Sequence, residues 1–131
     1  MSRLEPQLHE RLLGAIARGC GRLRPRPLAV VVFGSVARGA RNFRDVDLLC
    51  VAARERDKNL IHDAVASAFG QVQREFKVPV SAVVASSTEL SAPKLEAVTR
   101  EAHRDGVLVF GTAPAELSGM TIWKGAKGSS K

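Results

Sequence analysis

Two apolar runs separated by a short polar connection constrain the fold of this chain more than any other feature. Residues 28–33 and 46–52 are almost continuously apolar and rich in valine, which predicts two buried strands. The connection, residues 34–45, contains glycine and arginine and is too short to hold a long crossover helix. The two strands are therefore expected to be antiparallel neighbours in one sheet.

Helical and extended patterns alternate along the rest of the chain. Apolar residues recur every three or four positions in residues 4–23, 58–76 and 92–104, which predicts three helices. Further apolar runs predict strands at 78–85 and 107–110. The order helix, strand, strand, helix, strand, helix, strand favours an α+β (α/β) fold, in which a single mixed sheet of about four strands is flanked by helices.

The length of 131 residues fits one domain. We expect this domain to span residues 1–115 and residues 116–131 to form a basic, flexible C-terminal tail, because the apolar pattern fades there. No apolar stretch is long enough to cross a bilayer, and the N-terminus lacks the apolar segment of a secretory signal. These features predict a cytoplasmic protein with no membrane partner, in which Cys20 and Cys50 are small buried hydrophobic residues.

The chain is strongly basic, with a net charge of +7 and a pI of about 10.3. Such a surface attracts polyanions, which include NTPs, nucleic acids and acidic proteins. The side chains that stack on bases are scarce, with five Phe, one Trp and no Tyr, so an RNA partner is supported by charge alone. The three histidines lie in helical patterns away from the motifs described next, and none is assigned a metal.

The turn after the first predicted strand has the features of an anion site. Gly34 ends the strand, and its missing side chain lets another group approach the backbone. Ser35 follows with a hydroxyl at the expected start of a short helical turn. The unpaired N–H groups and the dipole of a helix start both favour phosphate.

Two carboxylates open the second predicted strand. Asp45 and Asp47 are two residues apart and therefore point to the same face of the strand, whereas Val46 points into the core. Like charges side by side repel each other and need a cation, and hard oxygen ligands favour Mg²⁺. A phosphate site beside a Mg²⁺-binding carboxylate pair is what phosphoryl or nucleotidyl transfer requires. Either motif alone is more often a simple turn or a solvated strand end, but their combination is much more specific.

The combined motif resembles the signature of the DNA-polymerase-β-type nucleotidyltransferase superfamily. The resemblance is greatest to its minimal bacterial members, the antitoxin-like minimal nucleotidyltransferase (MNT) domains. The segment Gly34-Ser35-Val36-Ala37-Arg38-Gly39 is similar to the first part of the family pattern, and Asp45-Val46-Asp47-Leu48-Leu49 is similar to the second. The connection between them is slightly shorter than in many members. The resemblance covers roughly residues 5–111, and residues 30–49 are its specific part.

This resemblance implies a role for each motif residue. Gly34 and Ser35 would contact the triphosphate of an NTP, with ATP expected, and the catalytic pair Asp45 and Asp47 would hold Mg²⁺. Arg38 would lie close to the phosphate loop, where it either neutralises phosphate charge or braces the turn. Minimal members often modify a HEPN-type toxin encoded beside them, so a protein partner is an attractive acceptor. A homodimer is another way to supply the substrate surface that larger relatives carry on an extra domain.

One departure from the family pattern concerns a third carboxylate. Members usually carry it on the strand after the second long helix, where it helps to hold the metal and to deprotonate the acceptor hydroxyl. Ser81 stands at this position, and a neutral hydroxyl is a far poorer Mg²⁺ ligand. Glu89, shortly after the strand, is a weak candidate to replace it, because solvation is the default for a polar loop.

Two functions follow from this departure. The first is an enzyme that transfers an NMP group from an NTP to a hydroxyl acceptor. The second is a catalytically impaired nucleotidyltransferase-fold protein that binds nucleotide, a partner or RNA without turnover. Ser81 favours the binding protein, whereas the intact glycine-serine and aspartate motifs favour the enzyme.

Overall fold

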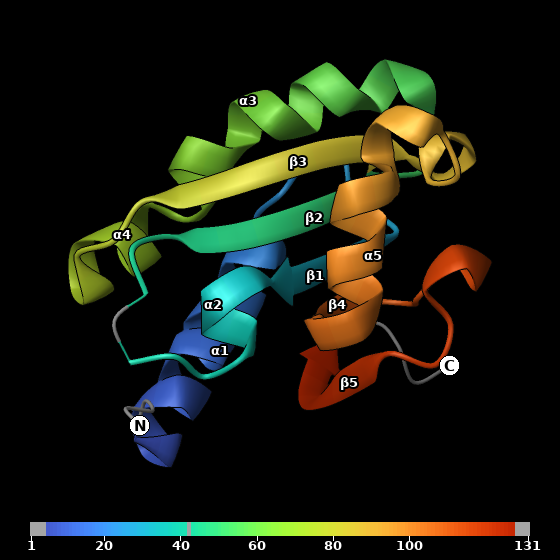
Figure 1. Ribbon diagram of the computed structural model, residues 1–131. Coiled ribbons are helices and arrows are strands. Elements are labelled where there is room, and N and C mark those ends of the chain that lie inside the picture. Colours follow the sequence, from blue (N-terminus) through green and yellow to red (C-terminus); the bar gives the residue numbers. More distant parts are fainter. Residues whose placement is uncertain (1–4, 42, 128–131) are drawn as a thin grey trace.

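A five-stranded mixed sheet forms the centre of the protein, which the computed structural model describes over residues 5–41 and 43–127 (Figure 1). The strands are β1 (Ala29–Phe33), β2 (Val46–Ala52), β3 (Val80–Ser86), β4 (Val107–Gly111) and β5 (Thr121–Lys127). Their order across the sheet is β3-β2-β1-β4-β5. Strand β1 is antiparallel to both β2 and β4, while β3 is parallel to β2 and β5 is parallel to β4. The predicted mixed sheet and the antiparallel pairing of its first two strands are confirmed.

The fifth strand differs from the prediction of about four strands. The segment Thr121–Lys127 contains lysine and glycine and lacks an apolar run, so periodicity gave no sign of it. It forms because its backbone pairs with β4, with Val107 opposite Thr121 and Leu108 opposite Ile122. An edge strand pairs on one side only and can keep polar side chains in solvent. Residues 128–131 of the expected tail lie outside the described residues, and the domain boundary at 115 stays a prediction.

Within the described residues, five α-helices accompany the sheet: α1 (Pro6–Cys20), α2 (Gly34–Ala37), α3 (Lys58–Ala68), α4 (Gly70–Phe76) and α5 (Glu96–Asp105). The predicted helix 58–76 is divided at Phe69, whose backbone leaves the helical region while its side chain is fully buried. The predicted helix 92–104 begins instead with the 3-10 turn Pro93–Leu95. No helix within the described residues is both long enough and apolar enough to cross a membrane.

The helices cover the two faces of the sheet differently, as Figure 1 shows with α5 in front and α1 behind. On one face, strand residues such as Leu48 and Cys50 pack with apolar side chains of α1, α3 and α4. On the other face, Leu49 and Val51 pack with α5 through Ala102. The alternation along β2 therefore assigns Asp47, which lies between Val46 and Leu48, to the face that α5 covers only in part. Cys20 and Cys50 are both buried, as expected.

Candidate active site

The turn between β1 and α2 requires glycine at position 34. Gly34 is buried and has a φ of +76°, a left-handed conformation that side chains disfavour. A Cβ at this position would lie 2.5 Å from Oδ2 of Asp47. Helix α2 begins here, and the first N–H groups of a helix have no partner within it. The turn can therefore present unpaired N–H groups to an anion, with the partly buried Ser35 as its second residue.

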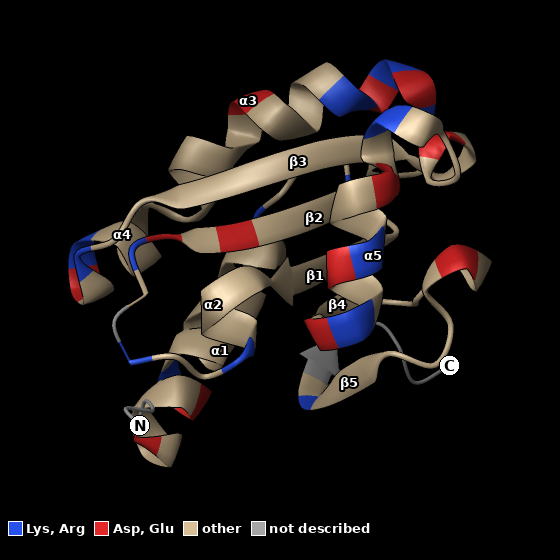
Figure 2. Cartoon of the chain, in the orientation of Figure 1, with Lys and Arg blue, Asp and Glu red and all other residues tan. Residues whose placement is uncertain are grey.

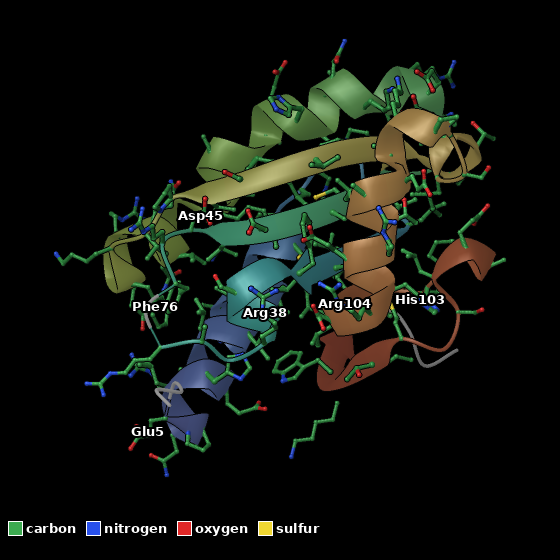
Figure 3. The ribbon with its side chains drawn as sticks, viewed as in Figure 1. Glu5, Arg38, Asp45, Phe76, His103 and Arg104 are labelled. Carbon is green, nitrogen blue, oxygen red and sulfur yellow. The ribbon has the colours of Figure 1, made fainter. Side chains whose placement is uncertain are left out.

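Asp47 lies directly beside this turn. In the antiparallel register Phe33 pairs with Asp47, so the end of β1 and the start of β2 meet at this residue. Val46 and Leu48 are fully buried on the opposite face. Asp45 comes one residue before the strand begins, and Figure 3 shows it at this end of β2. Both aspartates are partly buried.

Asp47 has more negative than positive side chains acting on it. Burial raises the pKa of Asp47, and the negative charges of Asp45 and Glu101 raise it further, whereas Arg38 lowers it. A divalent cation between the two aspartates would remove this repulsion. The pair therefore fits Mg²⁺, which commonly binds one or two carboxylates together with substrate phosphates. Within the described residues, no group of three or more His, Cys, Asp or Glu side chains is placed to hold a metal, so further ligands would come from substrate or solvent.

Ser81, which the resemblance places at the position of the third carboxylate, lies beside Asp47. Strands β2 and β3 are parallel, and Asp47 pairs with Ser81 in their register. The Ser81 residue is exposed. Glu89 does not replace the missing acid, because its Oε1 accepts hydrogen bonds from Nζ of Lys58 at 2.7 Å and from the backbone N–H of Ser86 at 3.0 Å. These contacts hold Glu89 at the other end of β3.

Helix α5 contributes two acidic side chains that the sequence did not assign to the site. Glu101 acts on the pKa of Asp47, and Oδ2 of Asp105 lies 3.5 Å from Nη1 of Arg38. Their spacing of four residues places both on one side of the helix. Figure 2 shows acidic positions at the start of β2 and along α5. The spacing is visible in the sequence, but nothing there indicates that this side of α5 faces β2.

The predicted site residues thus gather at one end of the central strands. The Asp47 carboxylate lies against Gly34, and the negative charge of Asp45 raises the pKa of Asp47. Arg38 lies at the end of α2 (Figure 3), where the ion pair with Asp105 braces the turn and its charge also reaches Asp47. The other two arginines of the connection, at positions 41 and 44, are exposed.

Two solved structures show the same fold at low sequence identity. One is the tri-AMPylated Shewanella oneidensis HEPN toxin in complex with MNT antitoxin. A chain of that complex matches with a TM-score of 0.53 and 18% identity, over 79% of this chain and 73% of that chain. The other is a toxin–antitoxin with AMP-PNP, matched with a TM-score of 0.55 and 18% identity over 79% and 77% of the two chains.

Sequence comparison gives the family directly. No curated protein matches the chain. The pattern of the family described as "Nucleotidyltransferase domain" matches residues 13–105, which extend from α1 to the end of α5 and include every predicted site residue. The shared fold, the matched pattern and the arrangement of the glycine turn against Asp47 agree. The chain therefore belongs to the nucleotidyltransferase domain family.

Proposed function

We propose that this protein transfers an NMP group, from ATP in the first place, to a hydroxyl acceptor in a Mg²⁺-dependent reaction. The turn at Gly34 and Ser35 holds the triphosphate, and Asp45 and Asp47 hold the metal. One observation carries this proposal: the absence of a Cβ at Gly34 lets the Asp47 carboxylate lie against the anion-binding turn. A phosphate and a carboxylate-bound cation would therefore share one small volume.

The chemistry follows from this arrangement. The acceptor oxygen attacks the α-phosphorus, the bond from that phosphorus to the β-bridging oxygen breaks, and pyrophosphate leaves as the acceptor proton passes to a base or to solvent. The N–H groups of the turn and the Ser35 hydroxyl hold phosphate oxygens in place. Bound Mg²⁺ supplies charge neutralisation at the phosphates. Arg38, braced by Asp105, adds a second positive charge at the edge of the site.

A protein is the acceptor that we favour. One fold relative is a chain of a complex between an AMPylated HEPN toxin and an MNT antitoxin, and the other is a chain of a toxin–antitoxin with AMP-PNP. A HEPN-type toxin in the cytoplasm is accordingly the first acceptor to test, with ATP as the donor. A homodimer is the alternative source of the missing substrate surface, and the net charge of +7 favours a test of RNA as well.

A second function is favoured by the geometry at Ser81. The residue opposite Asp47 on β3 is a neutral, exposed serine, and Glu89 is held elsewhere by Lys58. A site with two carboxylates instead of three has lost a metal ligand and a proton acceptor. Such a protein would bind NTP and its partner without turnover.

One experiment separates the two functions. The protein is incubated with Mg²⁺, α-labelled ATP and a purified HEPN-type toxin, beside the variant Asp45→Ala/Asp47→Ala. Asp63→Ala serves as the control, because Asp63 is an exposed aspartate on α3 away from the site. We expect label on the toxin with the wild type and with the control, and none with the double variant.

The possible results lead to different conclusions. Mg²⁺-dependent ATP binding without label transfer to toxin, RNA or the chain itself would support the binding protein and reject the enzyme. If Asp45→Ala/Asp47→Ala bound ATP and Mg²⁺ as well as the wild type does, the site itself would be wrongly assigned.

A further inference from the structure

A cavity of about 660 Å³ opens between α1 and the edge strand β5, which lie side by side (Figure 1). Its walls come from α1, from the segment before β1, from the end of β4 and from β5. No residue of α2 and neither Asp45 nor Asp47 lines it, so it is separate from the candidate active site. Its volume lies within the range of about 300–1,000 Å³ that is typical of small-molecule sites.

Two aromatic rings form part of the wall of this cavity. Trp123 is fixed by a hydrogen bond of 2.9 Å from its Nε1 to Oε1 of Glu10. This bond uses the only donor of the indole, and the ring lines the cavity from β5. Phe110 lines the cavity from the end of β4. Gly125 lies against the indole, where a Cβ would come 2.5 Å from the ring.

Two arginines add positive charge to the same cavity. Arg18 projects from the last turn of α1, and Cζ of Arg26 lies 5.3 Å from the centroid of the Phe110 ring. Both residues are exposed, and neither forms an ion pair within the part of the chain that the structure describes. No Asp or Glu of residues 5–41 and 43–127 lines the cavity. An anionic group entering here would therefore meet two guanidinium groups and no lining carboxylate.

We propose that this cavity is a second, metal-independent nucleotide site. The base of a nucleoside 5′-phosphate stacks on Trp123, and its phosphate binds Arg18 and Arg26. A neutral aromatic compound would leave the two cations unused, and a simple anion would leave the aromatic wall unused, whereas a nucleotide engages both. The same chemistry is available from a free mononucleotide and from the end of an RNA strand. The assignment goes beyond the proposed transfer reaction and does not depend on it.

Trp123 makes the site directly measurable, because it is the only tryptophan of the chain. AMP is titrated in the presence of EDTA while tryptophan emission is followed, with excitation at the red edge of its absorption, where adenine absorbs little. We expect saturable quenching in the wild type and equal quenching in Asp45→Ala/Asp47→Ala, which separates this site from the active site. Arg18→Gln/Arg26→Gln should weaken AMP binding at least about tenfold, as expected for the loss of two charged contacts. Arg22→Gln removes an exposed arginine outside the cavity and should leave the affinity unchanged.

Further ligands identify the chemistry and the source. Adenosine and inorganic phosphate should each bind more weakly than AMP, and phosphate should displace AMP. A short oligoadenylate that binds much more tightly than AMP would identify an RNA end as the source, and similar affinities would identify the free nucleotide. Absence of quenching at millimolar AMP would overturn the proposal. So would equal affinity in the wild type and in an Arg18→Gln/Arg26→Gln variant whose circular dichroism is native.

Discussion

Substitution of Gly34 by alanine tests the central geometry of the site. The added Cβ would lie 2.5 Å from Oδ2 of Asp47, while its distances to Cγ and Cβ of Asp47 are ordinary contacts of 3.4 and 3.5 Å. Oδ2 is the movable end of a side chain, so the clash is relieved when the carboxylate turns away. We therefore expect Gly34→Ala to displace the proposed metal ligand Asp47 and to leave the fold intact.

Gly39→Ala provides a matched control. Gly39 has a φ of +73°, close to the +76° of Gly34, but a Cβ there would have no neighbour within 4 Å. Both alanines carry the cost of a left-handed residue, roughly 1–2 kcal/mol. With an unfolding entropy of about 2.1 cal/mol/K per residue, each kcal/mol lowers the Tm of a chain of this length by about 4 °C. Both variants should thus lose about 4–8 °C.

Binding distinguishes the two variants. Isothermal titration with ATP and Mg²⁺ should give near-wild-type affinity for Gly39→Ala. For Gly34→Ala it should give a loss of at least about tenfold, or about 1.4 kcal/mol. Equal affinities in the two variants would refute the inference that Gly34 exists to admit the Asp47 carboxylate. A much larger Tm loss in Gly34→Ala would show that the backbone yields instead of the side chain.

Three further predictions add or remove a single carboxylate, and each is tested by measuring Tm in thermal denaturation. Ser81→Asp places an acid opposite Asp47, so it should lower Tm without metal and increase the Tm gain on adding Mg²⁺; an unchanged response to Mg²⁺ would contradict the register argument. The pKa of Asp47 is raised, so its charge costs stability as pH rises above its ordinary value of 3.8. Asp47→Asn should therefore raise the metal-free Tm at pH 7, with the gain shrinking as pH falls toward 3.8; a lower Tm at pH 7 would contradict this expectation. The pKa of Glu89 is lowered to about 2, first by its hydrogen bond from Lys58, so its contribution is present above pH 4.5 and is lost toward pH 2. Glu89→Gln should therefore lower Tm at pH 7 and reduce the fall of Tm between pH 4.5 and pH 2. Parallel plots of Tm against pH for the wild type and the variant would contradict a stabilising role of the Glu89 charge.

Much of the site was predictable because its parts are close together in the sequence. A buried strand, the glycine-serine turn and the Asp-x-Asp start of the next strand lie within residues 30–49. The short connection leaves the two strands antiparallel, and this pairing brings Asp47 next to the turn. Ser81 was selected by the family resemblance, and the parallel register of β2 and β3 places it opposite Asp47.

The rest of the site depends on contacts between distant segments. The predicted helix of residues 58–76 is divided at Phe69, whose ring is fully buried in the core. The side of α5 that carries Glu101 and Asp105 faces the aspartates only because Ala102 packs against the sheet. Periodicity identifies an apolar side of a helix but not the residues that its polar flank will meet.

The amino-acid sequence by itself determined the glycine-serine turn and the aspartate pair beside it, since both depend on the backbone geometry of neighbouring residues, and the family resemblance added Ser81 as the position of the third acid. Only the tertiary structure decided that β5 completes the sheet and that Trp123 meets Glu10, which lies 113 positions earlier in the chain. The pairing of an edge strand is fixed by hydrogen bonds to a partner already in place, and these bonds leave no periodic pattern in the strand's own residues. The cavity beside α1 therefore exists only in the folded chain.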